Sequence, residues 1–288
     1  MADSGRAETA PAKVNLTLRV LGRRADGYHD IESLVVFAGV GDELTFAPGA
    51  ELVLTVAGPT ADATGDIADN LVLKAARALA DRVEGLKVGS FALSKRLPVA
   101  AGLGGGSSDA AAALRLLAAA NGIAPGDPRL MQAARATGAD VPVCLDPMPR
   151  LMRGIGDILS GPLDLPKLPA VLVNPGVAVP TRDVFAALNL KPGTQSVDSG
   201  PPKTVALQDE INNGRNDLEE PAIELQPVIA EVLAVLRRLE GCRLSRMSGS
   251  GATCFGLFDT THSAQAAART LHVGYPDWWV RATVLGGP

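Results

Sequence analysis

The sequence is poor in aromatic and cysteine residues. Aromatic side chains make up 3% of the 288 residues, so alanine, valine and leucine must fill most of the core. The three cysteines, Cys144, Cys242 and Cys254, are far apart and form no C-x-x-C pair. This pattern argues against a disulfide framework and a cysteine-based zinc site, and it indicates buried thiols in a reducing compartment.

Long apolar runs and an excess of basic charge are also missing. No apolar run approaches the roughly 20 residues that span a bilayer, and residues 1–9 are polar with both charge signs, unlike a secretory signal. The net charge of −4 argues against a general binder of nucleic acids or membrane surfaces. We therefore expect a cytoplasmic protein with no nucleic-acid or membrane partner, present as a monomer or a weak homodimer.

A glycine-rich stretch, residues 97–109, is the most informative part of the sequence. A short alternating strand pattern precedes it at 90–94, and an alanine-rich helical run follows at 110–120. Glycines can adopt positive φ and bring backbone N–H groups close to an anion, and a helix N-terminus favours negative charge. The stretch predicts a phosphate-binding loop with Ser107, Ser108 and Asp109 at the start of the helix. A flexible loop capped by serine and aspartate is the alternative.

Three well-known loop types do not fit this stretch. A P-loop would need a lysine after Gly106, where Ser107 stands, and a dinucleotide-binding fingerprint would need a third glycine at that same position. No G-x-S-x-G pattern can be placed over Ser107 or Ser108, which argues against a nucleophile elbow. A dinucleotide-dependent oxidoreductase is therefore a poor interpretation.

Hydrophobic patterning predicts strands and helices over the whole chain. The second half reads β-α-α-β-β-α-β, which fits a split βαβ sandwich. Residues 146–169, rich in proline and glycine, are expected to form a domain crossover, and residues 191–202 a mobile loop. We expect strands at 12–20, 31–40, 43–46, 51–56, 90–94, 170–173, 243–247, 253–258 and 279–284, and helices at 71–83, 110–120, 128–137, 180–188, 221–239 and 264–271.

Several polar residues stand out, each with an ordinary structural explanation beside the functional one. Lys13 and Asn15 share the polar side of a strand, which could face a cleft or solvent. Tyr28 and His29 occupy a glycine-containing loop, where they could stack on a planar ligand or simply pack. Asp140 lies at a turn and could serve as a base or bond its own backbone.

Taken together, the motifs resemble the GHMP kinases, a family of small-molecule kinases named for galactose, homoserine, mevalonate and phosphomevalonate. Residues 11–16, 98–108 and 248–252 resemble its three motifs. Further blocks resemble the branch of the family that acts on a cytidine diphosphate substrate in the non-mevalonate isoprenoid pathway. These blocks lie at 24–29, 69–71, 95–98, 138–142 and 174–176.

The resemblance implies an α+β fold of two domains. An N-terminal domain, residues 1–165, is expected to resemble the second domain of ribosomal protein S5, and residues 166–288 are expected to be ferredoxin-like. The implied activity is transfer of the γ-phosphoryl group of ATP, with Mg²⁺, to the 2-hydroxyl of the methylerythritol unit. Another kinase of the same family, of the homoserine or mevalonate type, and a non-catalytic nucleotide-binding regulator are the alternatives.

The resemblance also assigns roles to individual residues. Asp140 becomes the catalytic base and Lys13 its electrostatic partner, while no residue is assigned as a metal ligand. The cytidine substrate is expected to contact Asn15, Tyr28, His29, Thr181 and Phe185. ATP is expected to contact Asn70, Lys95, Pro98, Val99, Ala100, Ala101, Gly102, Leu103, Gly104, Gly105, Gly106, Ser107 and Ser108.

Overall fold

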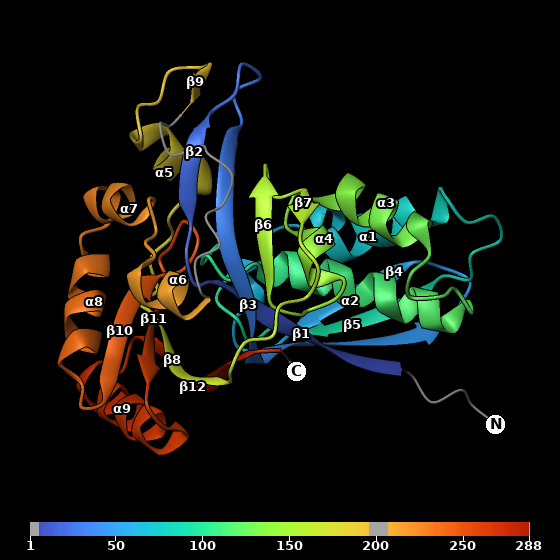
Figure 1. Cartoon of the computed structure of the whole chain (residues 1–288). Coiled ribbons are helices and arrows are strands. Elements are labelled where there is room, and N and C mark those ends of the chain that lie inside the picture. Colours follow the sequence, from blue (N-terminus) through green and yellow to red (C-terminus); the bar gives the residue numbers. More distant parts are fainter. Residues whose placement is uncertain (1–5, 196–206, 288) are drawn as a thin grey trace. The chain divides into compact units, whose positions relative to one another are not determined.

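The computed structural model describes residues 6–195 and 207–287, and the chain divides into two compact units (Figure 1). The first unit comprises residues up to 13, 41–99 and 104–147, and the second comprises 14–40, 100–103 and 148 onward. Both β1 (Arg6–Asn15) and β3 (His29–Pro48) contribute residues to each unit. The expected domain boundary after residue 165 stays a prediction.

The first unit combines a small sheet with a group of helices. The second half of β3 pairs antiparallel with β5 (Gly89–Ser94), which pairs parallel with β4 (Val53–Ala57). Two short 3₁₀ turns, Ala61–Ala63 and Ile67–Asp69, connect β4 to α1. The helices α1, α2 and α3 pack against one another, and α4 packs on α2 and α3. Their bounds are Leu71–Ala80, Gly105–Ala120, Pro128–Thr137 and Val141–Cys144.

The central helix of this unit, α2, is apolar almost all round. Its alanines from Ala110 to Ala113 are fully buried, together with Leu114 and Leu117. Small side chains let neighbouring helices approach closely, and a helix without a polar face must be surrounded by protein. Side-chain caps fix where α1 and α3 begin: Asn70 accepts from the N–H of Val72, and Asp127 from that of Arg129.

The second unit contains an antiparallel sheet with the strand order β10-β11-β8-β12. Numbered 1 to 4 along the chain as β8, β10, β11 and β12, these strands stand in the order 4-1-3-2 when read from β12. With α8 and α9 packed on them, they form the ferredoxin-like arrangement predicted from the sequence. The bounds are β8 Leu168–Asn174, β10 Cys242–Met247, β11 Cys254–Phe258, β12 Trp279–Gly286, α8 Val228–Arg238 and α9 Thr261–Gly274.

Further strands and short helices complete this unit. The first half of β3 pairs with both β2 and β6, and the end of β12 pairs with β3 near Ala38. The bounds are β2 Arg19–Arg23, β6 Arg150–Gly154, β7 Ile158–Leu159, β9 Thr194–Gln195, α5 Thr181–Ala187, α6 Leu207–Asn213 and α7 Glu219–Leu225.

Some expected elements are wrong in detail. The strand expected at 12–20 is interrupted, because β1 ends at Asn15 and β2 begins at Arg19. The helix expected at 221–239 is two helices, because Pro227 lacks the N–H that would continue α7 into α8. The proline-rich crossover contains the β6–β7 hairpin. Part of the expected loop at 191–202 forms β9, and residues 196–202 lie outside the described residues.

Candidate active site

The glycine loop ends in a helix N-terminus that has no side-chain cap. Gly104 is the N-cap of α2 and adopts a left-handed conformation, with φ of +60°. Ser107 and Ser108 lie in the first turn, and Ser108 Oγ donates to the carbonyl of Pro11 (2.6 Å). A cap by serine or aspartate is therefore wrong. A glycine cap supplies no acceptor for the first-turn N–H groups, which suits them to binding an anion.

Lys13 and Asp140, which are far apart in the sequence, form an ion pair beside this helix N-terminus. Lys13 Nζ lies 3.0 Å from Asp140 Oδ2. The Lys13 side chain is almost completely buried, whereas that of Asp140 is 36% exposed. A Cβ placed on Gly104 would lie 3.0 Å from Lys13 Cε, so the lysine runs directly along the loop. The carboxylate can therefore be reached from outside while the ammonium is fixed.

Arg115 of α2 connects the elements that carry this pair. Its Nε donates to Glu8 Oε2 on β1 (2.6 Å), and its Nη1 donates to the carbonyl of Cys144 at the end of α4 (2.8 Å). Lys13 lies after Glu8 on the same strand, β1, and Asp140 immediately precedes α4. Burial raises the pKa of Cys144 to about 12, so its thiol stays protonated at neutral pH. Arg115 and Glu8 are supporting residues that the sequence did not reveal.

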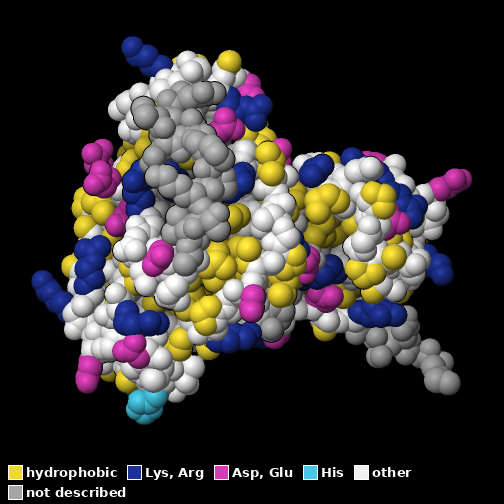
Figure 2. All heavy atoms as spheres, viewed as in Figure 1, with side chains coloured by type: hydrophobic (Ala, Val, Ile, Leu, Met, Phe, Trp, Pro, Cys, Tyr) yellow, Lys and Arg dark blue, Asp and Glu magenta, His cyan; other side chains and the backbone are white. Residues whose placement is uncertain are grey.

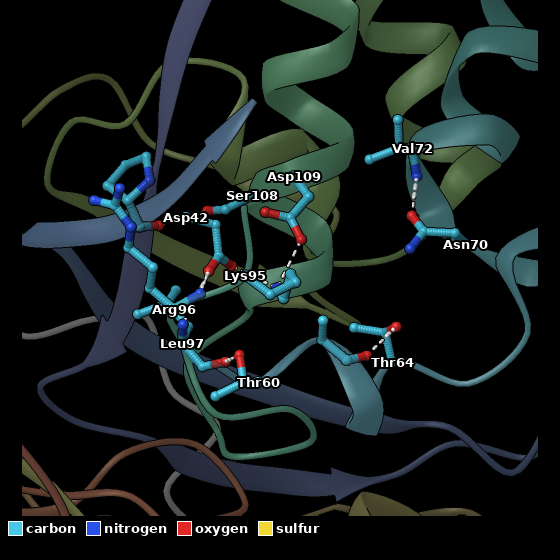
Figure 3. A network of polar contacts seen from close by, with 12 residues as sticks. Asp42, Thr60, Thr64, Asn70, Val72, Lys95, Arg96, Leu97, Ser108 and Asp109 are labelled. Carbon is cyan, nitrogen blue, oxygen red and sulfur yellow. Dashed lines mark hydrogen bonds and ion pairs between the residues drawn. The ribbon is translucent and has the colours of Figure 1, made fainter. Parts of the chain in front are cut away.

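Two of the expected ATP contacts, Asn70 and Lys95, have different surroundings (Figure 3). Asn70 uses its Oδ1 to cap α1. Lys95 follows β5 and is buried, with Nζ 2.5 Å from Asp42 Oδ2 and 2.8 Å from Asp109 Oδ2. Although burial lowers it, the carboxylates of Asp109 and Asp42 raise the pKa of Lys95 above its ordinary value. Lys95 is therefore part of a buried ion cluster with Asp42 and Asp109.

The middle of the glycine loop, residues 100–103, is held by the second glycine turn, residues 248–251. Ser248 Oγ donates to the carbonyl of Gly102 (2.9 Å), and the N–H of Thr253 donates to the carbonyl of Ala101 (3.1 Å). Gly102 has φ of +73°, and a Cβ there would lie 2.2 Å from the Ser248 carbonyl oxygen. Only glycine fits this approach. The candidates Leu103 and Ala101 are buried, and Val99 is exposed.

Asn15 is buried at the end of β1. Its Nδ2 donates to Ser33 Oγ (2.7 Å), which donates in turn to the carbonyl of Thr17. Its backbone N–H donates to Ser248 Oγ. The Asn15 side chain is thus fixed by Ser33, a residue that hydrophobic patterning had placed inside an ordinary strand.

Two of the rings expected to bind the cytidine substrate, those of His29 and Phe185, contact each other in the second unit. The rings of His29 and Phe185 stack, with centroids 4.8 Å apart and planes inclined by 30°. Burial and the nearby Arg23 guanidinium lower the pKa of His29, so its ring is neutral at pH 7. Its Nε2 is buried without a hydrogen-bond partner among the described residues.

Tyr28 is 61% exposed. Thr181 Oγ1 lies 2.8 Å from Ser250 Oγ, on the second glycine turn.

Within residues 6–195 and 207–287, no three His, Cys, Asp or Glu side chains are grouped so that they could hold a metal ion. Within the same residues, no helix is both long and apolar enough to cross a membrane.

The comparisons with known proteins give the class of protein, a small-molecule kinase that uses ATP. The family model described as GHMP kinases N terminal domain matches residues 70–146, and the model described as GHMP kinases C terminal matches residues 204–276. The α+β architecture predicted from the sequence is confirmed.

Similar proteins of known name identify the family within this class of kinases. A 4-diphosphocytidyl-2-C-methyl-D-erythritol kinase of Nitrobacter winogradskyi is 58% identical over 97% of this chain and 94% of its own length. A kinase of the same name from Xanthobacter autotrophicus is also 58% identical, over 96% and 97%. The chain belongs to the family of 4-diphosphocytidyl-2-C-methyl-D-erythritol kinases within the GHMP kinases.

Solved structures agree with this assignment. A crystal structure of 4-(cytidine 5'-diphospho)-2C-methyl-D-erythritol kinase has a TM-score of 0.79 and 35% identity, covering 98% of this chain and all of that chain. A homoserine kinase from Cytophaga hutchinsonii has a TM-score of 0.72 over 98% and 95% of the two chains. At 20% identity the second likeness shows the fold alone.

Proposed function

We propose that this chain transfers the γ-phosphoryl group of ATP to the 2-hydroxyl of 4-(cytidine 5'-diphospho)-2-C-methyl-D-erythritol. The observation that carries the proposal is the 3.0 Å pair of Lys13 and Asp140, placed along the glycine cap of α2. The names of the relatives support the choice of substrate.

Asp140 acts as the general base in this reaction. A tertiary alcohol is a weak nucleophile, and a carboxylate within hydrogen-bond reach can accept its proton as the new P–O bond forms. The substrate oxygen bonds to the γ-phosphorus, the bond from that phosphorus to the bridging β,γ-oxygen breaks, and ADP leaves. The exposure of the Asp140 side chain allows a substrate hydroxyl to reach it.

Lys13 has two roles in this proposal. Its ammonium lies 3.0 Å from Asp140 Oδ2 and holds the carboxylate in position. It also places a positive charge along Gly104, where the negative charge of the transferring phosphoryl group would gather. Because Lys13 is buried and lies against the loop, its charge is fixed before the substrates bind.

The phosphates of ATP are proposed to bind at the N-terminus of α2, where Gly104, Gly105 and Gly106 leave the backbone accessible. Mg²⁺ often binds substrate phosphates and water with few protein ligands. Such an ion would neutralise phosphate charge.

The cytidine end of the substrate is proposed to bind the second unit. The neutral ring of His29 has an Nε2 without a hydrogen-bond partner among the described residues, and this atom is proposed to bond to a base edge. The exposed ring of Tyr28 offers a stacking surface, and Phe185 stacks on the His29 ring. Asn15 and Thr181 are proposed to contact the substrate's polar groups.

An assay of ADP release tests the proposed function. We expect ADP release with the cytidine diphosphate substrate and none with mevalonate or homoserine. Release with either of the other alcohols alone would assign the chain to a different substrate. Absence of substrate-dependent release with all three would indicate a nucleotide-binding regulator.

Replacing Gly104 by alanine is expected to lower kcat about tenfold or more. The new Cβ would lie 3.0 Å from Lys13 Cε, so the lysine must move from its place beside Asp140, and a displacement of about 1 Å can cost up to 10²-fold in rate. Gly122→Ala is the matched control, because Gly122 has φ of +66° with nothing within 4 Å of its Cβ position. Equal kcat values for the two variants would contradict the proposed placement of Lys13.

Substituting His29 or Tyr28 by alanine is expected to raise the KM of the cytidine substrate about tenfold, since losing one stacking or hydrogen-bond contact costs about 1–3 kcal/mol. The KM of ATP should change little. Steady-state kinetics with each substrate varied in turn checks this, with the exposed His262→Ala as control. A rise confined to the KM of ATP would show that these residues serve the nucleotide instead.

A further inference from the structure

A buried ion cluster lies behind the first turn of α2 (Figure 3). It consists of Asp42 on β3, Lys95 after β5, and Asp109, the fifth residue of α2. The side chains are at most 4% exposed, and the single ammonium contacts both carboxylates. Lys95 and Asp109 stand just before and at the end of the glycine-rich stretch, so the cluster joins the two ends of the proposed phosphate loop.

The two carboxylates of this cluster are unequally supplied with hydrogen-bond donors. Asp42 Oδ1 accepts from the backbone N–H groups of Arg96 (2.5 Å) and Leu97 (2.9 Å), and Asp42 Oδ2 accepts from Lys95. Asp109 Oδ2 accepts from Lys95, whereas Asp109 Oδ1 is buried without a partner in the described part of the chain. An ionised oxygen in that environment is costly, so a proton is best placed on Asp109.

The charge of the cluster therefore depends on Asp109. With both carboxylates ionised the cluster carries a net charge of −1, and with Asp109 protonated it is neutral. Burial raises the pKa of Asp109 to about 7; Lys95 opposes this shift and Asp42 adds to it. Both charge states are accessible near neutral pH.

The cluster is close to the proposed phosphate site. A Cβ placed on Gly105, the first residue of α2, would lie 3.5 Å from Lys95 Nζ and 3.6 Å from Asp42 Oδ2. An anion bound at the N-terminus of α2 would be repelled by a net negative charge directly behind that residue. The neutral cluster is the form compatible with tight binding.

We propose that Asp109 is a positioning residue for ATP: it holds Lys95 behind the helix N-terminus and takes up one proton from solvent when the nucleotide binds. This inference rests on the proposed function, because it needs phosphates at the loop. The proton adds to the Asp109 carboxyl group, whose hydrogen bond with Asp42 favours the protonated form, while Lys95 continues to donate to Asp109. The affinity for ATP is then highest below pH 7 and falls as the pH rises and Asp109 ionises in the free protein.

Calorimetry of Mg·ATP binding to the full chain tests the inference. The titration is done without the cytidine substrate at about pH 7.5, in buffers of different ionisation enthalpy. We expect the wild type to take up a large fraction of a proton and Asp109→Asn almost none, because asparagine keeps the acceptor for Lys95 without titrating. The matched control, Asp81→Asn, removes an exposed carboxylate of the same unit and should keep the wild-type uptake.

A kinetic readout separates this role from a purely structural one. The KM of ATP in the wild type should rise about tenfold between pH 6.5 and 8.5. This is the effect expected if nucleotide binding raises the pKa of Asp109 by about one unit. In Asp109→Asn it should stay flat. The KM of the cytidine substrate should show no such difference between the two proteins.

The outcomes are distinguishable. ATP binding without proton uptake by the wild type, or with equal uptake by Asp109→Asn, overturns the inference and leaves the proposed function standing. Absence of Mg·ATP binding by the wild type overturns both. If Asp109→Asn does not fold, the wild-type buffer series still decides, since zero uptake contradicts the inference and uptake with the predicted fall in affinity supports it.

Discussion

Asp140→Asn is expected to lower kcat by about 10²–10⁴-fold, the usual contribution of a general base. Asparagine keeps the size of the side chain but cannot accept the proton of the 2-hydroxyl. Steady-state rates at saturating ATP and cytidine substrate measure the effect. The Kd of ATP should change much less, because Asp140 precedes α4 and is not part of the glycine loop.

Asp81→Asn is a suitable control, because it neutralises an exposed carboxylate at the end of α1 in the same unit. It should retain wild-type kcat. If Asp140→Asn turned over at a near-normal rate, Asp140 could not be the base, and the ion pair with Lys13 would be structural only.

Lys13→Met is expected to lower kcat by about 10²–10³-fold, as does removal of one preorganised donor from a developing charge. Methionine keeps most of the hydrocarbon chain that packs along Gly104, so the variant removes the ammonium with little loss of packing. Thermal unfolding of the variant should confirm that the fold persists.

The double variant Lys13→Met with Asp140→Asn tests whether the pair works as a unit. Residues that act together are strongly non-additive, so the double variant should be little slower than the slower single variant. A loss equal to the product of the two single losses would mean that Lys13 and Asp140 act independently, despite the 3.0 Å between them.

Local sequence signals predicted most elements of the fold. The helix at 128–137 was located to the residue, because Asp127 and Pro128 are a strong start signal and Gly138 follows the end. The ferredoxin-like pattern followed from the order of strands and helices. The errors lie where tertiary contacts override local pattern. The expected strands 31–40 and 43–46 are one long strand, β3, because its two halves pair with different strands.

Fewer features of the candidate site than of the fold could be predicted from local sequence signals. No spacing rule joins Lys13 to Asp140, and only the family resemblance suggested that they meet. Asp42 was overlooked because a charged residue beside Gly41 reads as a turn, whereas it is fully buried and binds Lys95. Asp109 was expected at the helix start, but it faces inward to the same lysine. A buried charge leaves no mark in hydrophobic patterning, because its partners come from distant segments.

Asp140 is proposed to control the transfer of a phosphoryl group to the 2-hydroxyl. Phosphorus NMR of the product tests this most directly, because carbon 2 of the methylerythritol unit carries a methyl group and no hydrogen. We predict a new phosphomonoester signal without three-bond coupling to a carbinol proton, which is lost with Asp140→Asn. A signal split by such protons would contradict transfer to the 2-hydroxyl. A signal that forms in Asp140→Asn as fast as in the wild type would contradict the role of Asp140.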